Sequence, residues 1–366
     1  MLLAVVGLAA LAAVCLFIST GNGAAFGAPP AGTRLTRMMA SPNHRGGVFV
    51  NSQATHVLGL AESGSLFSEF LFGGQQRAPL QPLPVLTGTA TAVSRPPASG
   101  LRITWLGHSS LLVEIDGTRV LTDPVFAERA SPSTLVGPAR FHAPPASIAE
   151  LGELDAVVIS HDHYDHLDMK TIQELALTRA RFFVPLGVGA HLERWNISPA
   201  RIEEHGWWQE SLVGGVRLIA TPARHFSGRA LTDRDRTLWA SWTLVGPGHR
   251  VYFSGDTGPM PEFVEIGKRF GPFDVALLEV GAYNEKWGDI HLGPRKALSA
   301  FRELRAKRLI PVHWGTFNLA FHAWMEPAET LYALARKNRV TLLTPRIGES
   351  LEPTRGAATE PWWRKL

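Results

Sequence analysis

A short histidine-rich segment carries the strongest chemical signal in the sequence. His161, His163, Asp165 and His166 fall within six residues, directly after an apolar run at residues 155–160. Imidazole and carboxylate groups are the usual protein ligands of zinc and similar divalent metals. Because four ligands on one short loop cannot all face one tetrahedral ion, we expect two neighbouring ions. The first two histidines would bind one ion, and Asp165 with His166 would bind the other.

Three later residues have the same local setting, because each follows a run of apolar residues that is typical of a buried strand. They are His225, Asp256 and His313, which follow residues 216–220, 250–254 and 309–312. Alone, each is more often structural. With the first cluster they bring the number of candidate ligands to seven, which is enough for two ions.

Other polar residues are candidates for supporting roles. We predict that His291 acts on the substrate side, with a helix cap as the alternative, and that it is catalytic together with Asp256 and Asp165. Asp123 follows another strand and is placed to hydrogen-bond a ligand imidazole, although a turn aspartate is the alternative. His108 is a candidate for the same role.

The elements that must position these residues follow from the apolar pattern. Strands are predicted at residues 101–105, 110–115, 119–122, 155–160, 216–220, 250–254, 274–278 and 309–312. Helices are predicted at residues 169–178, 259–269, 294–305 and 327–337. The strands begin as a meander and then alternate with helices, which favours an α/β fold of two packed sheets with helices outside.

The order of the seven candidate ligands resembles that of the metallo-β-lactamase superfamily. The resemblance spans roughly residues 101–348. It implies a four-layered αββα sandwich and two divalent metal ions, with zinc expected and iron or manganese as alternatives. It also implies the ligand sets: His161, His163 and His225 on the first ion; Asp165, His166 and His313 on the second; and Asp256 between them.

Shorter segments resemble one branch of that superfamily, the N-acyl-phosphatidylethanolamine-hydrolysing phospholipase D enzymes, which neighbour the ascorbate-6-phosphate lactonase-like group. They are residues 105–109, 121–126, 206–208, 221–227, 281–283 and 291–294, with a further match at 41–51. The sequence departs from the branch at Ile290, where the mammalian enzyme has a polar amide. It also departs at Glu279, where an apolar or proline-containing run is usual. We expect both positions to lie close to the substrate.

This combination predicts a binuclear metal-dependent hydrolase. Two such ions hold a bridging water and lower its pKa, so that hydroxide exists near neutral pH. The resemblance favours a phospholipase D-type phosphodiesterase that acts on N-acyl-phosphatidylethanolamine-like lipids. The alternatives are a lactonase or phosphoesterase for a small soluble substrate, and a non-enzymatic metal-binding protein.

The charge and the apolar segments of the sequence limit the binding partners and the cellular locations that we expect. The net charge is +4, but lysine and arginine are scattered, so we expect no nucleic-acid partner. Residues 2–18 are almost wholly apolar and are long enough for a bilayer span. We therefore predict a membrane anchor or signal at 1–20, with export after cleavage as the alternative to anchoring. A linker and arm would follow at 21–100, the hydrolase domain at 101–350 and a tail at 351–366.

Overall fold

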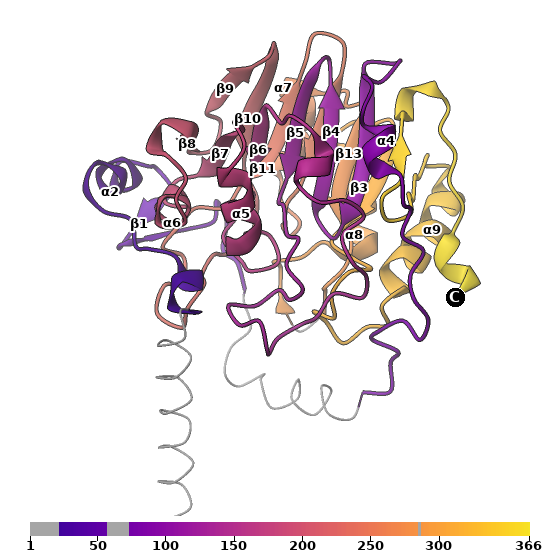
Figure 1. The fold of residues 1–366 in the computed structure, drawn as a ribbon, viewed down its shortest axis with the longest axis horizontal. Helices are drawn as coiled ribbons and strands as arrows, with labels where there is room; N and C mark the ends of the chain where they lie inside the picture. Colours follow the sequence, from indigo (N-terminus) through magenta and orange to yellow (C-terminus); the bar gives the residue numbers. More distant parts are fainter. Residues whose placement is uncertain (1–21, 57–72, 285–286) are drawn as a thin grey trace, which may run out of the picture.

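The computed structural model describes residues 22–56, 73–284 and 287–366, which form two large β-sheets covered by helices (Figure 1). The predicted membrane segment at residues 2–18 lies outside the described residues. Among those that are described, no helix is long and apolar enough to cross a bilayer.

The first sheet has seven strands in the order β15-β3-β4-β5-β6-β7-β8. In chain order they are β3 (Leu101–Gly107), β4 (Ser110–Ile115), β5 (Thr118–Thr122), β6 (Ala156–Val158), β7 (Arg181–Pro185), β8 (Ile202–His205) and β15 (Ser350–Leu351). The β4–β5 turn is made by Asp116 and Gly117, whose φ angles of 47° and 84° suit a tight hairpin. Strands β5 to β8 are parallel, so their carboxyl ends share one edge.

The second sheet has six strands in the order β14-β13-β12-β11-β10-β9. They are β9 (Glu210–Val213), β10 (Val216–Thr221), β11 (Ser241–Val245), β12 (Arg250–Phe253), β13 (Val275–Glu279) and β14 (Leu309–Val312). The last three are parallel.

Alternation along the strands explains the layers. Val113 and Val158 belong to the core that the two sheets share, whereas their neighbours Leu112 and Val157 face a second core. That second core contains residues of α5 (Met169–Ala176) and α6 (Gly189–Arg194). Helices α7 (Glu262–Phe270), α8 (Gly293–Glu303) and α9 (Glu326–Asn338) supply apolar residues to the first core and pack near the six-stranded sheet. The predicted α/β sandwich is confirmed.

Part of the region that we predicted as a linker and arm is regular structure. Helix α2 (Gly32–Met39) is followed by the short hairpin of β1 (His44–Arg45) and β2 (Val48–Phe49). Arg34 and Arg37 of α2 both bind the buried carboxylate of Glu204 in β8, at 2.9 and 2.5 Å. The helix is therefore fixed to the edge of the seven-stranded sheet (Figure 1). Farther along the arm, the four-residue helix α4 (Thr89–Ala92) precedes β3.

The C-terminal tail also packs on the domain. Trp362 and Trp363 are buried, and Trp362 stacks on Trp314 with ring centroids 5.4 Å apart. Trp314 directly follows the predicted ligand His313. The tail thus supports the end of β14 that leads into the candidate site.

Candidate metal centre

The predicted site residues converge because they follow strand ends on one edge of the sandwich. His108 follows β3, Asp123 follows β5, and the histidine-rich loop follows β6. From the other sheet, Asp256 follows β12 and His313 follows β14. The structure brings all seven predicted ligands into one cluster, in which His163 and Asp165 are half-buried and the other five are buried.

The first group, the three-histidine set, consists of His161, His163 and His225. One potential ligand atom from each lies within 4.8 Å of the others. His163 Nδ1 is 2.8 Å from His161 Nε2 and 3.3 Å from His225 Nε2. Three imidazoles whose nitrogens converge in this way could hold one divalent ion.

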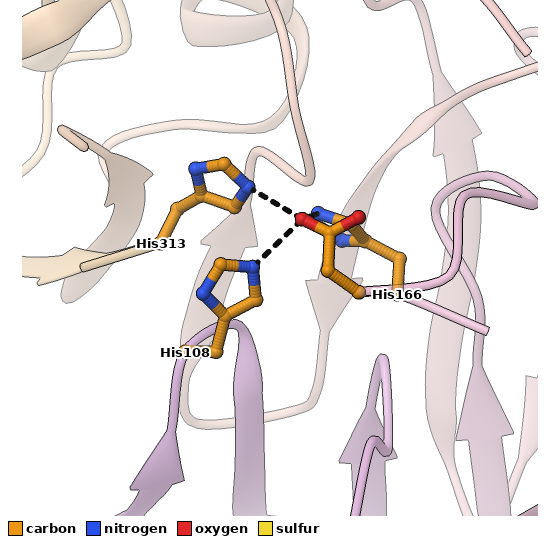
Figure 2. A group of neighbouring side chains, drawn as sticks. His108, His166 and His313 are labelled. Atoms are coloured by element: carbon orange, nitrogen blue, oxygen red, sulfur yellow. Dashed lines mark hydrogen bonds and ion pairs between the residues drawn. The ribbon is translucent and has the colours of Figure 1, made fainter. Parts of the chain in front are cut away.

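The second group, the mixed set, consists of His108, Asp165, His166 and His313. Figure 2 shows the three imidazoles around one carboxylate. Asp165 Oδ2 is 3.0 Å from His108 Nε2, 3.2 Å from His313 Nε2 and 3.4 Å from His166 Nε2. His108 therefore contacts the predicted ligand Asp165 directly, whereas we expected it to support a ligand imidazole.

Asp256 lies between the two sets. Its Oδ1 is 3.2 Å from His166 Nε2, and its Oδ2 is 3.1 Å from His313 Nε2 and 3.8 Å from His225 Nε2. It also groups with His161 and His166, one residue from each set. This carboxylate is placed to be shared by two ions.

Two buried atoms show that the cluster fits a cation. Within the described part of the chain, His166 Nε2 and Asp256 Oδ1 are buried; they lie 3.2 Å apart as an ion pair, but neither atom has a partner in hydrogen-bond geometry. Buried polar atoms are nearly always hydrogen-bonded. Nitrogen and carboxylate oxygen are also the donor types that zinc, iron and manganese accept. A divalent ion on either side of Asp256 would satisfy both atoms.

The two sets differ in charge when no metal is bound. Burial lowers the pKa of His161 and of His225 well below the ordinary value, so both rings are neutral and ready to bind a metal. Burial also opposes charge on His313, but Asp256 and Asp165 outweigh it and raise its pKa to about 10. A cation that enters the mixed set therefore displaces a proton, because ligand imidazoles must be neutral.

Buried carboxylates hold the histidine-rich loop in place. Asp123 accepts hydrogen bonds from Ser160 N at 2.6 Å and from His166 Nδ1 at 2.7 Å. The second bond leaves Nε2 of His166 to face the cluster. Asp162, which we did not predict as a ligand, points away and accepts from Gly228 N and Thr237 Oγ1 at 2.8 and 2.7 Å.

A cavity of about 380 Å³ opens beside the cluster. Its wall includes predicted ligands and His291, together with Phe226, Arg234, Trp287, Ile290 and Leu319. Ile290 thus lines the cavity, as we expected for a position near the substrate. Glu279 does not line it: its side chain is fully buried behind His291, and His291 Nδ1 donates to its Oε2 at 2.8 Å.

Sequence patterns missed the contribution of the N-terminal arm. Asn51 Nδ2 donates to His225 O at 2.8 Å, and its Oδ1 accepts from His225 N at 3.1 Å. Arg224 donates to Ala54 O and to Asp289 Oδ2 at 2.6 and 3.0 Å. These contacts fix the loop of His225. The only available signal was the match of residues 41–51 to the family arm.

Comparison with known proteins identifies the family. The family described as "Beta-lactamase superfamily domain" matches residues 118–314, which is more than half of the chain and includes all seven candidate ligands. The chain belongs to the metallo-β-lactamase superfamily.

Two relatives place this metallo-β-lactamase superfamily member more closely. It is 47% identical over 350 residues to an uncharacterized protein of Mycobacterium tuberculosis, covering 94% of this chain and 93% of the relative. It is 36% identical over 249 residues to N-acyl-phosphatidylethanolamine-hydrolyzing phospholipase D 1 of Caenorhabditis elegans. The match covers 64% of this chain and 70% of the relative. The predicted phospholipase D-like branch is confirmed, and the chain is a metal-dependent hydrolase.

Solved structures agree on the fold. A metallo hydrolase of the archaeon Ignicoccus hospitalis aligns with a TM-score of 0.53 at 23% identity, over 69% of this chain and 97% of that one. At this sequence identity the structural similarity shows the fold alone, and that fold is the sandwich described above.

Proposed function

We propose that this hydrolase is a phosphodiesterase of the phospholipase D type that acts on N-acyl-phosphatidylethanolamine-like lipids. It would use two divalent ions, with zinc as the first choice. The three-histidine set would hold one ion, Asp165, His166 and His313 the other, and Asp256 would be shared. His108, which contacts Asp165, would orient that carboxylate.

The composition of the cavity wall carries this proposal. Phe226, Trp287, Ile290 and Leu319 give the space beside the cluster an apolar surface, while Arg234 adds a cation to the same wall. A phosphodiester lipid has a matching composition, with an anionic phosphate next to apolar chains. The Caenorhabditis elegans relative, a phospholipase D that hydrolyses N-acyl-phosphatidylethanolamine by its name, supports the same substrate class.

Bound metal ions would supply a water of lowered pKa and would neutralise the negative charge that develops on the phosphoryl oxygens. The chain's own residues bind and orient the substrate. Arg234 would attract the phosphate, and the aromatic wall would exclude water from the reacting bond. His291, on the cavity wall, is the side chain placed to meet the leaving group.

We further propose that residues 2–18 hold the enzyme at a membrane. The apolar run supports this, and so does the attachment of the chain that follows it. Arg229 donates to Ala25 O at 2.7 Å and to Asp162 O at 2.6 Å. Residues just after the apolar run are therefore tied to the loop that carries the ligands, which would keep the site close to a lipid surface.

The test is the release of phosphatidic acid from N-acyl-phosphatidylethanolamine, measured by mass spectrometry with the full chain in mixed detergent–lipid micelles. We expect product from the wild type and none above background from Asp256→Ala, which removes the carboxylate shared by both sets. The exposed Glu360→Ala, whose side chain is 75% exposed, is the matched control and should keep its activity. No product from a wild-type chain that holds two metals by elemental analysis would contradict the lipid substrate. Lactones and small phosphodiesters would then be screened.

A further inference from the structure

We propose that Glu279 is a positioning residue that acts through His291, so that His291 Nε2 delivers a proton to the oxygen of the leaving group. This inference rests on the proposed phosphodiester hydrolysis and extends it to a residue at which the sequence departs from its branch.

The surroundings of Glu279 fix both of its carboxylate oxygens. It ends β13, and its side chain is fully buried. Oε1 accepts hydrogen bonds from Leu292 N at 2.8 Å and from Thr257 N at 3.2 Å. Oε2 accepts from His291 Nδ1 at 2.8 Å. A buried carboxylate bound in this way cannot rotate without breaking all three bonds.

His291 is held as firmly on its other sides. Its ring stacks on His313 at a centroid distance of 5.5 Å and meets the edge of His225 at 5.2 Å. Only 11% of its side chain is exposed, and it lines the cavity. Because Glu279 is an acceptor, Nδ1 must carry a hydrogen. Nε2 is then the ring nitrogen left to act on a substrate.

A carboxylate behind an imidazole orients the ring and stabilises its protonated form, as in the catalytic triad of serine hydrolases. In the proposed step a water oxygen forms a bond to phosphorus and the bond from phosphorus to the leaving oxygen breaks. The electron pair stays on that oxygen, which takes the proton from Nε2. His291 is left neutral with Nδ1–H still on Glu279. The water loses one proton to solvent, and His291 regains one from solvent.

Metal binding is an alternative role for Glu279 and His291. Potential ligand atoms of Asp256, Glu279, His291 and His313 also lie within 4.8 Å of one another, so these residues could hold a cation. The position of Glu279 argues against this role, since its side chain is fully buried, does not line the cavity and has its Oε2 bound to His291 Nδ1. Metal content distinguishes the two roles, because only a ligand role predicts that loss of Glu279 or His291 removes metal.

Glu279→Gln is the informative substitution. The amide oxygen can still accept from Leu292 N and Thr257 N, so the local backbone keeps its bonds. The amide nitrogen then faces His291 Nδ1 and donates to it, which reverses the hydrogen-bond direction and removes the acceptor. His291→Asn is the second variant, because it removes Nε2 and keeps a polar atom near the Nδ1 position.

Two substrates that share a phosphatidyl group but differ in their leaving group test whether His291 donates a proton to that group. N-acyl-phosphatidylethanolamine has an alkoxide leaving group that needs a proton, whereas phosphatidyl-p-nitrophenol releases a phenolate that does not. General acid catalysis contributes roughly 10²–10⁴-fold. We expect each variant to lose about 100-fold or more in kcat on the first substrate and far less on the second. Leu319→Ala, which changes the apolar wall of the cavity, should affect both substrates by similar factors.

The double variant and the metal content complete the test. If Glu279 acts through His291, Glu279→Gln with His291→Asn loses no more than the worse single variant. Equal losses on both substrates, additive losses in the double variant, or a loss of metal would each overturn the proposal.

Failure of the proposed function would be distinguishable. A wild type that cleaves neither phosphodiester contradicts it, and a matched pair of alkyl and p-nitrophenyl carboxylic esters then tests the role of Glu279 by the same ratio.

Discussion

At the scale of single residues, Asp123 shows how this site uses a buried carboxylate. Its backbone has a φ of 33°, a strained value for a residue with a side chain, and His108 and His313 share this feature at 53° and 64°. Burial raises the pKa of Asp123, although bonds from His166 and Ser160 oppose the rise. The hydrogen bonds from Ser160 and His166 hold Asp123 in this strained and buried position. The same bonds fix the orientation of the His166 ring.

Asp123→Asn tests that role. The amide can still accept from Ser160 N, but its second group is an N–H that cannot accept from His166 Nδ1. We expect metal affinity to fall about 10–100-fold, the usual effect of removing a residue that orients a metal ligand. Competition with a chelator measures it. Asp116→Asn, the same change at the turn where β4 ends away from the site, should leave metal affinity unchanged.

At the scale of elements, the loops after β12 and β13 fit together so closely that one glycine is required. A Cβ built on Gly258 would lie 1.5 Å from Asp289 O, which belongs to the backbone and not to the end of a flexible side chain. Asp289 is two residues before His291. The absence of a side chain at position 258 therefore decides where His291 sits.

Gly258→Ala should displace the segment that carries His291. Overpacking typically costs about 1–3 kcal/mol in stability, and a misplacement of about 1 Å at a reacting group can cost about 100-fold in rate. We expect kcat to fall by at least about tenfold and the thermal midpoint to drop. Gly74→Ala is the control, since a Cβ there meets nothing within 4 Å. A variant with wild-type kcat would show that the loops are more adaptable than described.

At the scale of the whole molecule, the residues before α2 belong to the folded unit. Trp195 Nε1 donates to Ala24 O at 2.7 Å, and the buried Arg229 donates to Ala25 O through two nitrogens. The guanidinium also packs over the rings of Tyr164 and Trp195. The start of the described chain is therefore part of the support of the histidine-rich loop.

A chain that begins at residue 31 should have a lower thermal midpoint than one that begins at residue 22. The shorter chain leaves donors of a buried guanidinium unpaired, at a cost of about 1–3 kcal/mol or more. Thermal unfolding followed by circular dichroism compares the two in detergent. Identical midpoints would mean that residues 22–30 contribute no stability.

The sequence predicted many of the strands that have an apolar local pattern, although β7 and β11, which have one too, were not predicted. The continuous apolar run before His161 marks a strand buried on both faces, and β12 and β14 have the same character. Strand β8 was missed because it contains Glu203 and Glu204, which are unusual in a strand. Their charges are offset by Arg181 and Arg34 from other elements, which no local pattern reveals.

The residues of the candidate site also fall into two groups: those that a local sequence pattern identifies, and those whose role depends on contacts between distant segments. His161 to His166 could be recognised because the residues are contiguous, and His313 because it follows an apolar strand. Asn51 could not, since its bond to His225 joins positions 174 residues apart. Glu279 was noticed as a departure from the family, but whether its side chain faced the cavity or the back of His291 depended on the packing of β13 against the loop before α8.

The uneven spacing of the ligands has a consequence for the unfolded chain. Four of them lie within six residues and need no folding to come together, whereas the contact of His313 with Asp165 spans 148 residues. The histidine-rich segment is thus a chelating peptide even in a denatured chain. Metal bound there stabilises the unfolded ensemble, so part of the gain from native binding is cancelled. The rise in melting temperature on adding metal should therefore be smaller than the native affinity alone would give.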